Sequence, residues 1–246
     1  MGSAVTSYTG NWGIKSLHQV EITSNCNLRC VYCPSPNLGR PKLDMSRAHF
    51  LRAMEGVKHL VSVGTQGELN IAGIGESTLH PDFVEYVRIA RGSIGWQRKL
   101  HFATNGLLMT RDLAKAIAPF RPSVAVSMHR PEKAKGAIDA LREFGLFEGA
   151  ASDAATNAVD WAGQVDWKLT TDNFGSPCDW RSQGWIAVLA DGRMSSCAMD
   201  ADGSGVIGHV DQEFDTVRGR PYKLCKGCHF DVGVDGFRNR VEGRLA

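Results

Sequence analysis

Short apolar runs alternate with amphipathic segments along most of this 246-residue chain, and this alternation constrains the fold more than any other feature. Such a pattern is typical of β-α units, in which successive strands lie parallel in one sheet. The predicted strands are residues 17–23, 68–75, 99–106, 123–129 and 165–171. The predicted helices are residues 46–60, 80–91, 110–120 and 131–145, and residues 147–163 are left unassigned.

Residue types at the helix ends agree with these boundaries. Ser46 is a suitable N-cap for the first helix, because its side-chain oxygen can accept a hydrogen bond from an otherwise unpaired backbone N–H. Pro81 is expected in the first turn of the second helix, where a missing N–H does no harm. Gly145 is expected to end the fourth helix, since a glycine often occupies the left-handed position there.

These units predict an α/β fold, a partial (incomplete) TIM-like βα barrel. Four or five units fit between residues 17 and 175, whereas a complete eight-unit barrel takes about 250 residues. Functional residues of such folds gather at the carboxyl ends of the strands. The candidates at these ends are Cys26, Gly75, Glu76, Asn105, Ser127 and His129.

The chain is expected to divide into a polar N-terminal tail (residues 1–16), the barrel (residues 17–175) and a small C-terminal domain (residues 176–246). After residue 175 the pattern changes to a short strand, a turn at Asp191-Gly192, and a second strand-like run. An Asp-Gly pair between two such runs is a strong signal for a β-hairpin. The C-terminal domain is therefore predicted to contain a hairpin and loops.

The composition is that of an ordinary soluble domain, with 43% hydrophobic residues, 22% charged residues and a formal net charge of +2. The chain has no run of about 18 apolar residues, as a membrane span would need, and its N-terminus lacks the pattern of a signal peptide. We therefore expect a cytoplasmic protein with no membrane partner, in which the cysteines remain reduced.

The seven cysteines fall into two separate groups. Cys26, Cys30 and Cys33 form a C-x3-C-x2-C motif, and Cys178, Cys197, Cys225 and Cys228 lie in the last third of the chain. Three thiolates exceed the needs of a redox C-x-x-C pair, and a zinc ion would require a distant fourth ligand. A [4Fe-4S] cube held by three thiolates leaves one iron open, which accounts for the odd number.

The three-cysteine motif, with Tyr32 before its last cysteine, resembles the radical S-adenosylmethionine (SAM) superfamily. GIGES (residues 73–77) resembles the family's Gly-Gly-Glu-Pro motif, although Ile74 and Ser77 depart from it, and ATNG (residues 103–106) resembles the third-strand motif. The resemblance implies that the open iron binds the amino and carboxylate groups of SAM. The residues it implies as SAM contacts are Tyr32, Gly73, Gly75, Glu76, Asn105, Ser127 and His129.

The four later cysteines can close either a zinc site or an iron–sulfur cube, and their chemistry alone leaves both open. The surrounding segments ADGRMSSC (190–197), VIGHV (206–210) and LCKGC (224–228) resemble the twitch domain, a short auxiliary-cluster module. The resemblance implies a second [4Fe-4S] cluster with full cysteine ligation and no open iron. The layout is similar to that of small twitch-domain dehydrogenases that oxidise an aminocyclitol alcohol.

The resemblance implies an enzyme that cleaves SAM reductively to a 5′-deoxyadenosyl radical and takes a hydrogen from its substrate, with flavodoxin or ferredoxin as the electron donor. The expected substrate is a small molecule or a modified nucleoside that is oxidised or rearranged. The candidate substrate contacts are Lys168, Asp172, Asn173 and Arg181. Residues 216–246 hold seven Lys/Arg and three acidic residues, a net +4, which suits an anionic substrate, including one attached to nucleic acid.

Two alternatives remain, one with another substrate and one of a different class. The chain could be a radical SAM enzyme that modifies peptides or proteins, but no winged-helix-like recognition domain precedes the barrel. It could also be a non-catalytic module that binds zinc or iron–sulfur clusters. Metal content separates the last alternative from the enzyme, because two cubes hold about eight irons and a zinc module one or two zinc ions.

Overall fold

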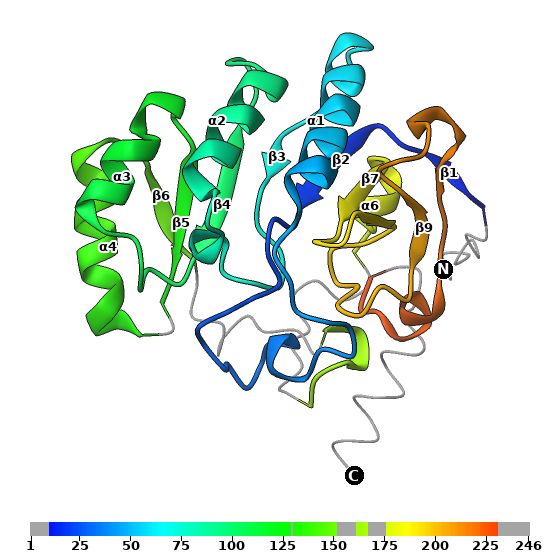
Figure 1. The fold of residues 1–246 in the computed structure, drawn as a ribbon. Coiled ribbons are helices and arrows are strands. Elements are labelled where there is room, and N and C mark those ends of the chain that lie inside the picture. Colours follow the sequence, from blue (N-terminus) through cyan, green and yellow to red (C-terminus); the bar gives the residue numbers. More distant parts are fainter. Residues whose placement is uncertain (1–9, 129, 152–160, 167–175, 231–246) are drawn as a thin grey trace, which may run out of the picture.

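The computed structural model describes residues 10–128, 130–151, 161–166 and 176–230. Within these residues, the main sheet has eight strands in the order β6-β5-β4-β3-β2-β7-β8-β9 (Figure 1). Pairing is parallel from β6 to β7 and antiparallel from β7 to β9. The strands are β2 (Ser16–Val20), β3 (Leu69–Asn70), β4 (Leu100–Thr104), β5 (Ser123–Ser127), β6 (Phe147–Ala151), β7 (Trp185–Val188), β8 (Arg193–Ser195) and β9 (Val206–His209). The predicted α/β class is confirmed, with an open and mostly parallel sheet.

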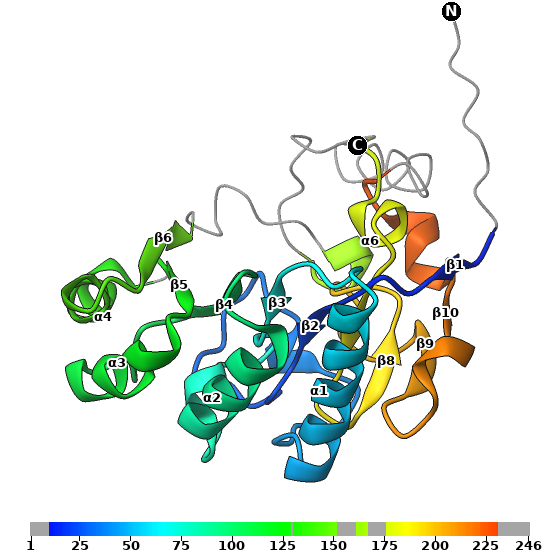
Figure 2. The same cartoon turned by 90° about the horizontal axis from the view of Figure 1, so that it is seen from above.

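Four helices follow the parallel strands and lie on the same side of the sheet (Figures 1 and 2). They are α1 (Arg47–Ser62), α2 (Phe83–Ile94), α3 (Arg111–Ile117) and α4 (Pro131–Glu143). The side chain of Ser46 accepts a hydrogen bond from the His49 N–H, so this predicted cap is confirmed. Gly145 has a φ of 68°, as expected after a helix. The placement of Pro81 is wrong, because α2 begins after Asp82.

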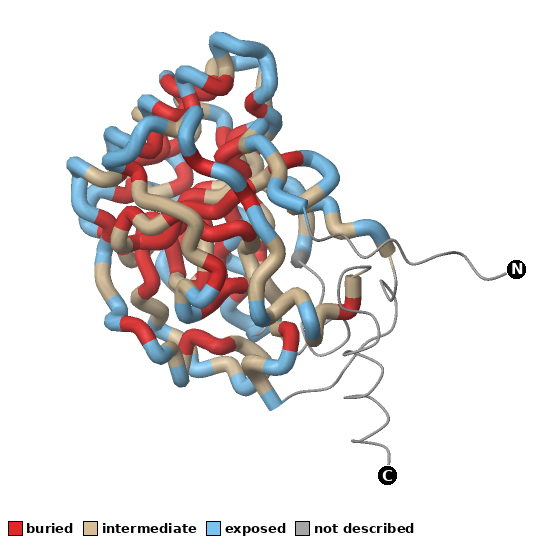
Figure 3. Tube along the Cα trace, turned by 90° about the vertical axis from the view of Figure 1, so that its right-hand side faces the viewer, coloured by how far each residue is buried: buried red, intermediate tan, exposed pale blue. Residues whose placement is uncertain are grey.

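The core lies between these helices and the sheet. Phe50 of α1 stacks on Tyr86 of α2 with ring centroids 3.9 Å apart, and Phe83 meets Phe102 of β4 edge to face at 5.2 Å. The Tyr86 hydroxyl donates a hydrogen bond to the Met45 carbonyl at 3.0 Å, so its polar end is paired. Buried positions run through the middle of the fold (Figure 3). Each such large side chain contributes roughly 1.5–3 kcal/mol of stability by leaving water.

The C-terminal segment continues the same sheet. Strand β7 pairs in parallel with β2, and β8 folds back on β7 through the predicted turn, where Gly192 has a φ of 86°. A second sheet pairs β1 (Trp12–Gly13) with β10 (Arg218–Gly219). The shorter helical elements are α6 (Asp179–Ser182) and the 3-10 turns η1 (Ser35–Asn37), η2 (Ser77–Leu79), η3 (Ala118–Phe120), η4 (Trp161–Gly163), η5 (Phe214–Thr216) and η6 (Lys223–Gly227). The predicted domain boundaries stay a prediction.

Two predicted strands differ from the structure. The strand expected over residues 68–75 is confined to β3, because the chain leaves the sheet to enter a tight loop. The strand expected over residues 165–171 lies mostly outside the described residues, and Val165 and Asp166 belong to no strand. No helix in the described part of the chain combines the length and the apolar character that crossing a bilayer would require.

Candidate active site

The first cysteine group lies in a long loop that leaves the carboxyl end of β2. The base of this loop is closed by backbone hydrogen bonds from Ser24 N–H to the Leu43 carbonyl (3.0 Å) and from Met45 N–H to the Ile22 carbonyl (2.8 Å). The Thr23 hydroxyl also donates to the Asp44 carboxylate at 2.6 Å. Residues 26–42 are therefore held at both ends against the sheet.

The three cysteines of this loop are partly buried and influence one another. Burial raises the pKa of the Cys26 thiol. Burial, followed by the charges of Cys30 and Cys26, raises the pKa of the Cys33 thiol to about 11, against a hydrogen bond from the Ser35 N–H at 3.4 Å. Thiolates are the form that binds metal, so the group needs nearby positive charge to ionise. An iron–sulfur cluster supplies that charge, and the donor set fits one.

The glycines of GIGES allow the next strand to approach this loop closely. A Cβ on Gly75 would lie 2.3 Å from the Thr23 carbonyl oxygen and 2.6 Å from the Asn25 carbonyl oxygen. A Cβ on Gly73 would lie 2.5 Å from Cγ of Glu21. The Glu76 N–H then donates to the Asn25 carbonyl at 2.8 Å. Because these two glycines lack side chains, the segment after β3 can pack directly against the start of the cysteine loop.

We expect Gly75→Ala to destabilise the folded protein by about 1–3 kcal/mol, since its methyl group meets two carbonyl oxygens that belong to the backbone. The matched control is Gly136→Ala, where nothing lies within 4 Å of the added Cβ. Gly136 is exposed within α4, so alanine should stabilise the protein by about 0.5–1 kcal/mol. Urea unfolding measures both. Equal effects of the two substitutions would contradict the close approach at Gly75.

The Glu76 carboxylate is buried, with 3% of the residue exposed, and both of its oxygens accept hydrogen bonds within the protein. Oε1 accepts hydrogen bonds from the Thr78 N–H (3.2 Å), the Thr78 hydroxyl (2.6 Å) and the Thr104 hydroxyl (2.8 Å). Oε2 accepts one from the Asn105 N–H at 2.6 Å. A carboxylate offers about four acceptor positions, two on each oxygen. Among the described residues Oε2 accepts one hydrogen bond, so an ammonium group could bind at Oε2, whereas Oε1 is already crowded by three donors.

Hydrogen bonds of Asn105 connect the segments that follow three neighbouring strands, β2, β3 and β4. It follows β4, its N–H donates to Glu76, and its side-chain Nδ2 donates to Oδ1 of Asn27 at 2.7 Å. Asn27 lies inside the cysteine loop and was not a predicted site residue. The clue in the sequence is its place within CNLRC, although nothing there shows that it meets the third strand. The predicted gathering of Glu76 and Asn105 beside the cysteines is thus observed, while their roles remain predictions.

For the other predicted SAM contacts, Ser127 and Tyr32, the structure shows backbone contacts only. Ser127 ends β5 and pairs in register with Ala151 of β6. The Tyr32 carbonyl accepts a hydrogen bond from Nε1 of Trp161 at 3.1 Å. The remaining predicted residues His129, Lys168, Asp172 and Asn173 lie outside the described residues.

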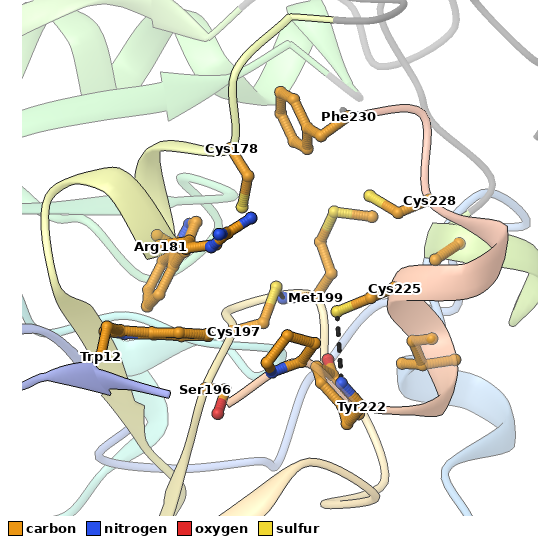
Figure 4. Close-up of a pocket in the computed structure, with 14 residues that line it drawn as sticks. Trp12, Cys178, Arg181, Ser196, Cys197, Met199, Tyr222, Cys225, Cys228 and Phe230 are labelled. Atoms are coloured by element: carbon orange, nitrogen blue, oxygen red, sulfur yellow. Dashed lines mark hydrogen bonds between the residues drawn. The ribbon is translucent and has the colours of Figure 1, made fainter. Parts of the chain in front are cut away.

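The second cysteine group surrounds a pocket beside the β7–β8 hairpin (Figure 4). Its four thiols come from the residue before α6, the segment after β8, and η6 with the residue that follows it: Cys178, Cys197, Cys225 and Cys228. Trp12, Trp180 and Tyr222 line the same pocket. Arg181 lines it too, and its charge lowers the pKa of Cys225 against the larger effect of burial. Arg181 therefore lies beside these thiols, and contact with a substrate remains a prediction.

The thiols of this pocket are desolvated and receive backbone hydrogen bonds. Burial raises the pKa of Cys197, and it raises the pKa of Cys228 to about 11. The Met199 N–H donates to Cys197 Sγ at 3.3 Å, and the Tyr222 N–H donates to Cys225 Sγ at 3.5 Å, the contact dashed in Figure 4. Hydrogen bonds to ligand sulfurs and exclusion of water are among the factors that determine the reduction potential of an iron–sulfur cluster.

The spacing of the thiols favours clusters over single zinc ions. Tetrahedral zinc with bonds of about 2.3 Å holds its thiolates about 3.8 Å apart. All seven cysteines belong to the described part of the chain, and no three of their Sγ atoms lie within 4.8 Å of one another. A cube spreads its ligands more widely, because each thiolate binds a different iron. Neither group is therefore already arranged as a compact tetrahedral zinc site.

A buried ion pair connects the two cysteine regions. Nη2 of Arg40 donates to Oε1 of Glu21 at 2.6 Å, and the two side chains are 4% and 1% exposed. Glu21 follows β2 and also accepts hydrogen bonds from the N–H groups of Ile74 (2.9 Å) and Ala190 (3.1 Å). Nε of Arg40 donates to the Ala201 carbonyl at 2.6 Å. The pair thus ties the cysteine loop to the segment that follows Cys197.

Residues 20–154, more than half of the chain, match the radical SAM superfamily. With the three-cysteine loop at the carboxyl end of its first parallel strand, the chain belongs to this superfamily, and the resemblance seen in the sequence is confirmed. Members combine a [4Fe-4S] cluster with SAM.

Two curated relatives match part of the chain. A tungsten-containing aldehyde ferredoxin oxidoreductase cofactor-modifying protein of Pyrococcus furiosus is 33% identical over 99 residues, which are 40% of this chain and 26% of the relative. A GTP 3′,8-cyclase of Chlorobaculum tepidum is 30% identical over 122 residues, which are 48% of this chain and 34% of the relative. The chain therefore spans only about a quarter to a third of these relatives.

Solved structures agree on the fold. BtrN in complex with AdoMet and 2-DOIA superposes with a TM-score of 0.66 and 19% identity, covering 82% of this chain and 80% of that chain. Native anSMEcpe with bound AdoMet gives a TM-score of 0.58 and 15% identity, covering 81% of this chain and 79% of that chain. At such identities the likeness concerns the fold, and it extends well beyond the parallel strands into the C-terminal segment.

Proposed function

We propose that this protein is a radical SAM enzyme that oxidises or rearranges a small molecule or a modified nucleoside. The observation that supports it most is the loop with Cys26, Cys30 and Cys33, held at the same sheet edge as Glu76 and Asn105 in a member of the superfamily. A reduced cluster bound there supplies the chemistry, cleavage of SAM to methionine and a 5′-deoxyadenosyl radical that takes a hydrogen from the substrate.

The residues around this loop would bind and orient the nucleotide. Three cysteine ligands leave one iron for the amino and carboxylate groups of SAM. Glu76 fixes the positions of Thr104 and Asn105 through hydrogen bonds of 2.8 and 2.6 Å, so these groups are already ordered before SAM arrives. Such preorganisation lowers the entropy that is lost when a ligand is positioned for reaction. The loop glycines keep the backbone close enough for these contacts.

We further propose that Cys178, Cys197, Cys225 and Cys228 hold an auxiliary [4Fe-4S] cluster. Two observations support a cube: the four thiols line one pocket, and no three of their Sγ atoms all lie within 4.8 Å of one another. With every iron bound to cysteine, this cluster would not bind substrate. It would instead accept an electron from the substrate or support the fold, while flavodoxin or ferredoxin supplies the electron that starts the reaction.

The names of the relatives support the substrate class but do not select a member of it. GTP 3′,8-cyclase is named for a nucleotide substrate, and the BtrN structure contains 2-DOIA beside AdoMet. Peptide modification remains the second candidate, because anSMEcpe structures contain bound peptides and share the fold. A nucleic-acid-attached substrate would be recognised by its phosphates.

The test is anaerobic reconstitution followed by incubation with SAM and a strong reductant. We expect about eight irons per chain and formation of 5′-deoxyadenosine that depends on both the reductant and the protein. One or two zinc ions per chain with no 5′-deoxyadenosine would support the non-catalytic module and sink the proposal. Incubation with pools of aminocyclitols, nucleosides and peptides then shows which class increases the yield.

A further inference from the structure

A cluster of two histidines and one glutamate lies on the face of the sheet opposite the helices, and it includes no cysteine. His18 belongs to β2, Glu68 directly precedes β3, and His101 belongs to β4. The neighbours of these histidines, Leu17 and Phe102, belong to the core under the helices, with Phe102 packed against Phe83. His18 and His101 share the opposite face, because their ring centroids lie 6.3 Å apart. Strand β2 is irregular between Leu17 and Gln19, so these ring contacts, and not alternation alone, place His18.

The distances within this cluster suit ligands of one cation better than hydrogen bonds. Nε2 of His18 and Nε2 of His101 each lie 3.6 Å from the same oxygen, Oε1 of Glu68. This separation exceeds that of a normal hydrogen bond, whereas ligands about 2.1 Å from a tetrahedral ion lie roughly 3.4 Å apart. The ligand atoms of all three residues lie within 4.8 Å of one another.

The buried Nε2 of His101, which makes no hydrogen bond, is a second, independent observation; the unpaired nitrogen of His18 is Nδ1, not the Nε2 that lies 3.6 Å from Glu68. Within the described part of the chain, Nδ1 of His18 and Nε2 of His101 are buried and make no hydrogen bond. Leaving such atoms unpaired costs about 1–3 kcal/mol each. A cation would satisfy the nitrogen of His101, which lies 3.6 Å from the Glu68 carboxylate. The ring of His18 is held in place by stacking on Trp185, with centroids 3.8 Å apart.

We propose that His18, Glu68 and His101 form a site for one divalent transition-metal ion, Zn²⁺ or Fe²⁺. Two imidazoles and one carboxylate make up a ligand set that both ions accept, with further positions left for water. The side chain of Glu68 is 37% exposed, so solvent can reach the site.

The ion would act as a brace. It would join three adjacent strands, β2, β3 and β4, across this face of an open sheet. The ring of His18 also meets Trp180 edge to face at 5.4 Å, and Trp180 lines the pocket of the four later cysteines. Metal binding would therefore stiffen the wall that these two sites share. None of its three ligands belongs to the proposed active site, so it stands independently of the proposed function.

The test uses the protein with its clusters assembled, so that the thiols are occupied, after a wash with chelator. Samples are equilibrated anaerobically with ZnCl₂ or with ferrous salt, desalted, and analysed for metal. We expect one zinc, or one iron beyond the cluster irons, per chain, and a rise in the unfolding temperature. Glu68→Gln and His101→Gln should each weaken binding at least tenfold.

The control is His209→Gln, which removes a histidine from the other group of potential ligands, His49, His209 and Asp211. It should leave the extra ion in place. Failure to bind any extra ion, or loss of the ion in His209→Gln with retention in Glu68→Gln, would overturn the proposal.

A spectroscopic measurement decides the question even where both variants fold poorly. Co²⁺ added to the wild-type protein should show visible bands of nitrogen and oxygen ligation, without the near-ultraviolet charge-transfer band of thiolate ligands. A thiolate band would show instead that the ion binds cysteines, against the proposal.

Discussion

Replacing Cys30 with alanine is expected to abolish 5′-deoxyadenosine formation, with yields falling to the level of a reaction without protein. Cys30 is the middle cysteine of the three-cysteine loop and a proposed cluster ligand, and two thiolates would not retain a cube that already lacks a fourth protein ligand. The iron content should fall from about eight to about four per chain, as one of two cubes is lost. Product is measured by chromatography after incubation with SAM and reductant.

The matched variant is Cys197→Ala, which removes a cysteine, and hence a proposed ligand, from the other group. It should also lose about four irons, yet some SAM cleavage should remain, because the three-cysteine loop is intact. Folding or turnover should be impaired, since Cys197 is half-buried just after β8 and lines the pocket of the four later cysteines. Product from Cys30→Ala, or complete loss of product in Cys197→Ala alone, would reverse the assignment of the two groups.

Arg40→Met is expected to destabilise the folded protein by about 3–5 kcal/mol, because it leaves the Glu21 carboxylate buried without its partner. The double variant Glu21→Gln with Arg40→Met should recover part of this loss, since no charge then remains buried. Denaturant unfolding of the four forms in a double-mutant cycle gives the coupling energy. The single variant should also retain less iron, because Arg40 links the first cysteine loop to Ala201.

An exposed ion pair provides the control for this prediction. Arg52 and Glu55 pair at 3.0 Å on α1, with side chains 59% and 62% exposed. Arg52→Met should therefore cost less than about 1 kcal/mol. Similar losses for Arg40→Met and Arg52→Met would mean that burial adds nothing to the Glu21–Arg40 pair.

Local signals explain why the helices and the class of cofactor could be predicted from the sequence. Ser46 caps α1 through a contact only three residues away, and apolar periodicity shows which face of a helix is buried. The three cysteines lie within eight consecutive residues, so their spacing carries the resemblance on its own. Features of this kind need no knowledge of which strand lies beside which.

Contacts between distant residues explain what the sequence could not show. Asn27 meets Asn105 across 78 residues, and Glu21 sits in a strand-like run where an acidic residue reads as solvent-facing. Strand β3 ends at Asn70, and the segment after it reaches Gly75, where a Cβ would meet the Thr23 carbonyl oxygen at 2.3 Å. The glycine pair was visible, but its role in packing depends on a neighbour that periodicity does not identify.

The pairing of β2 with β7 affects how the chain folds during its synthesis on the ribosome. Ser16 and Trp185 are partners in that ladder and lie 169 residues apart in the sequence. Contacts of such long range form late, because a large loop must close first. During synthesis, the strand that leads into the first cysteine loop keeps one edge without its β7 partner until residue 188 has emerged. An edge of this kind invites pairing with other chains, so nascent protein should be most prone to aggregation during that interval.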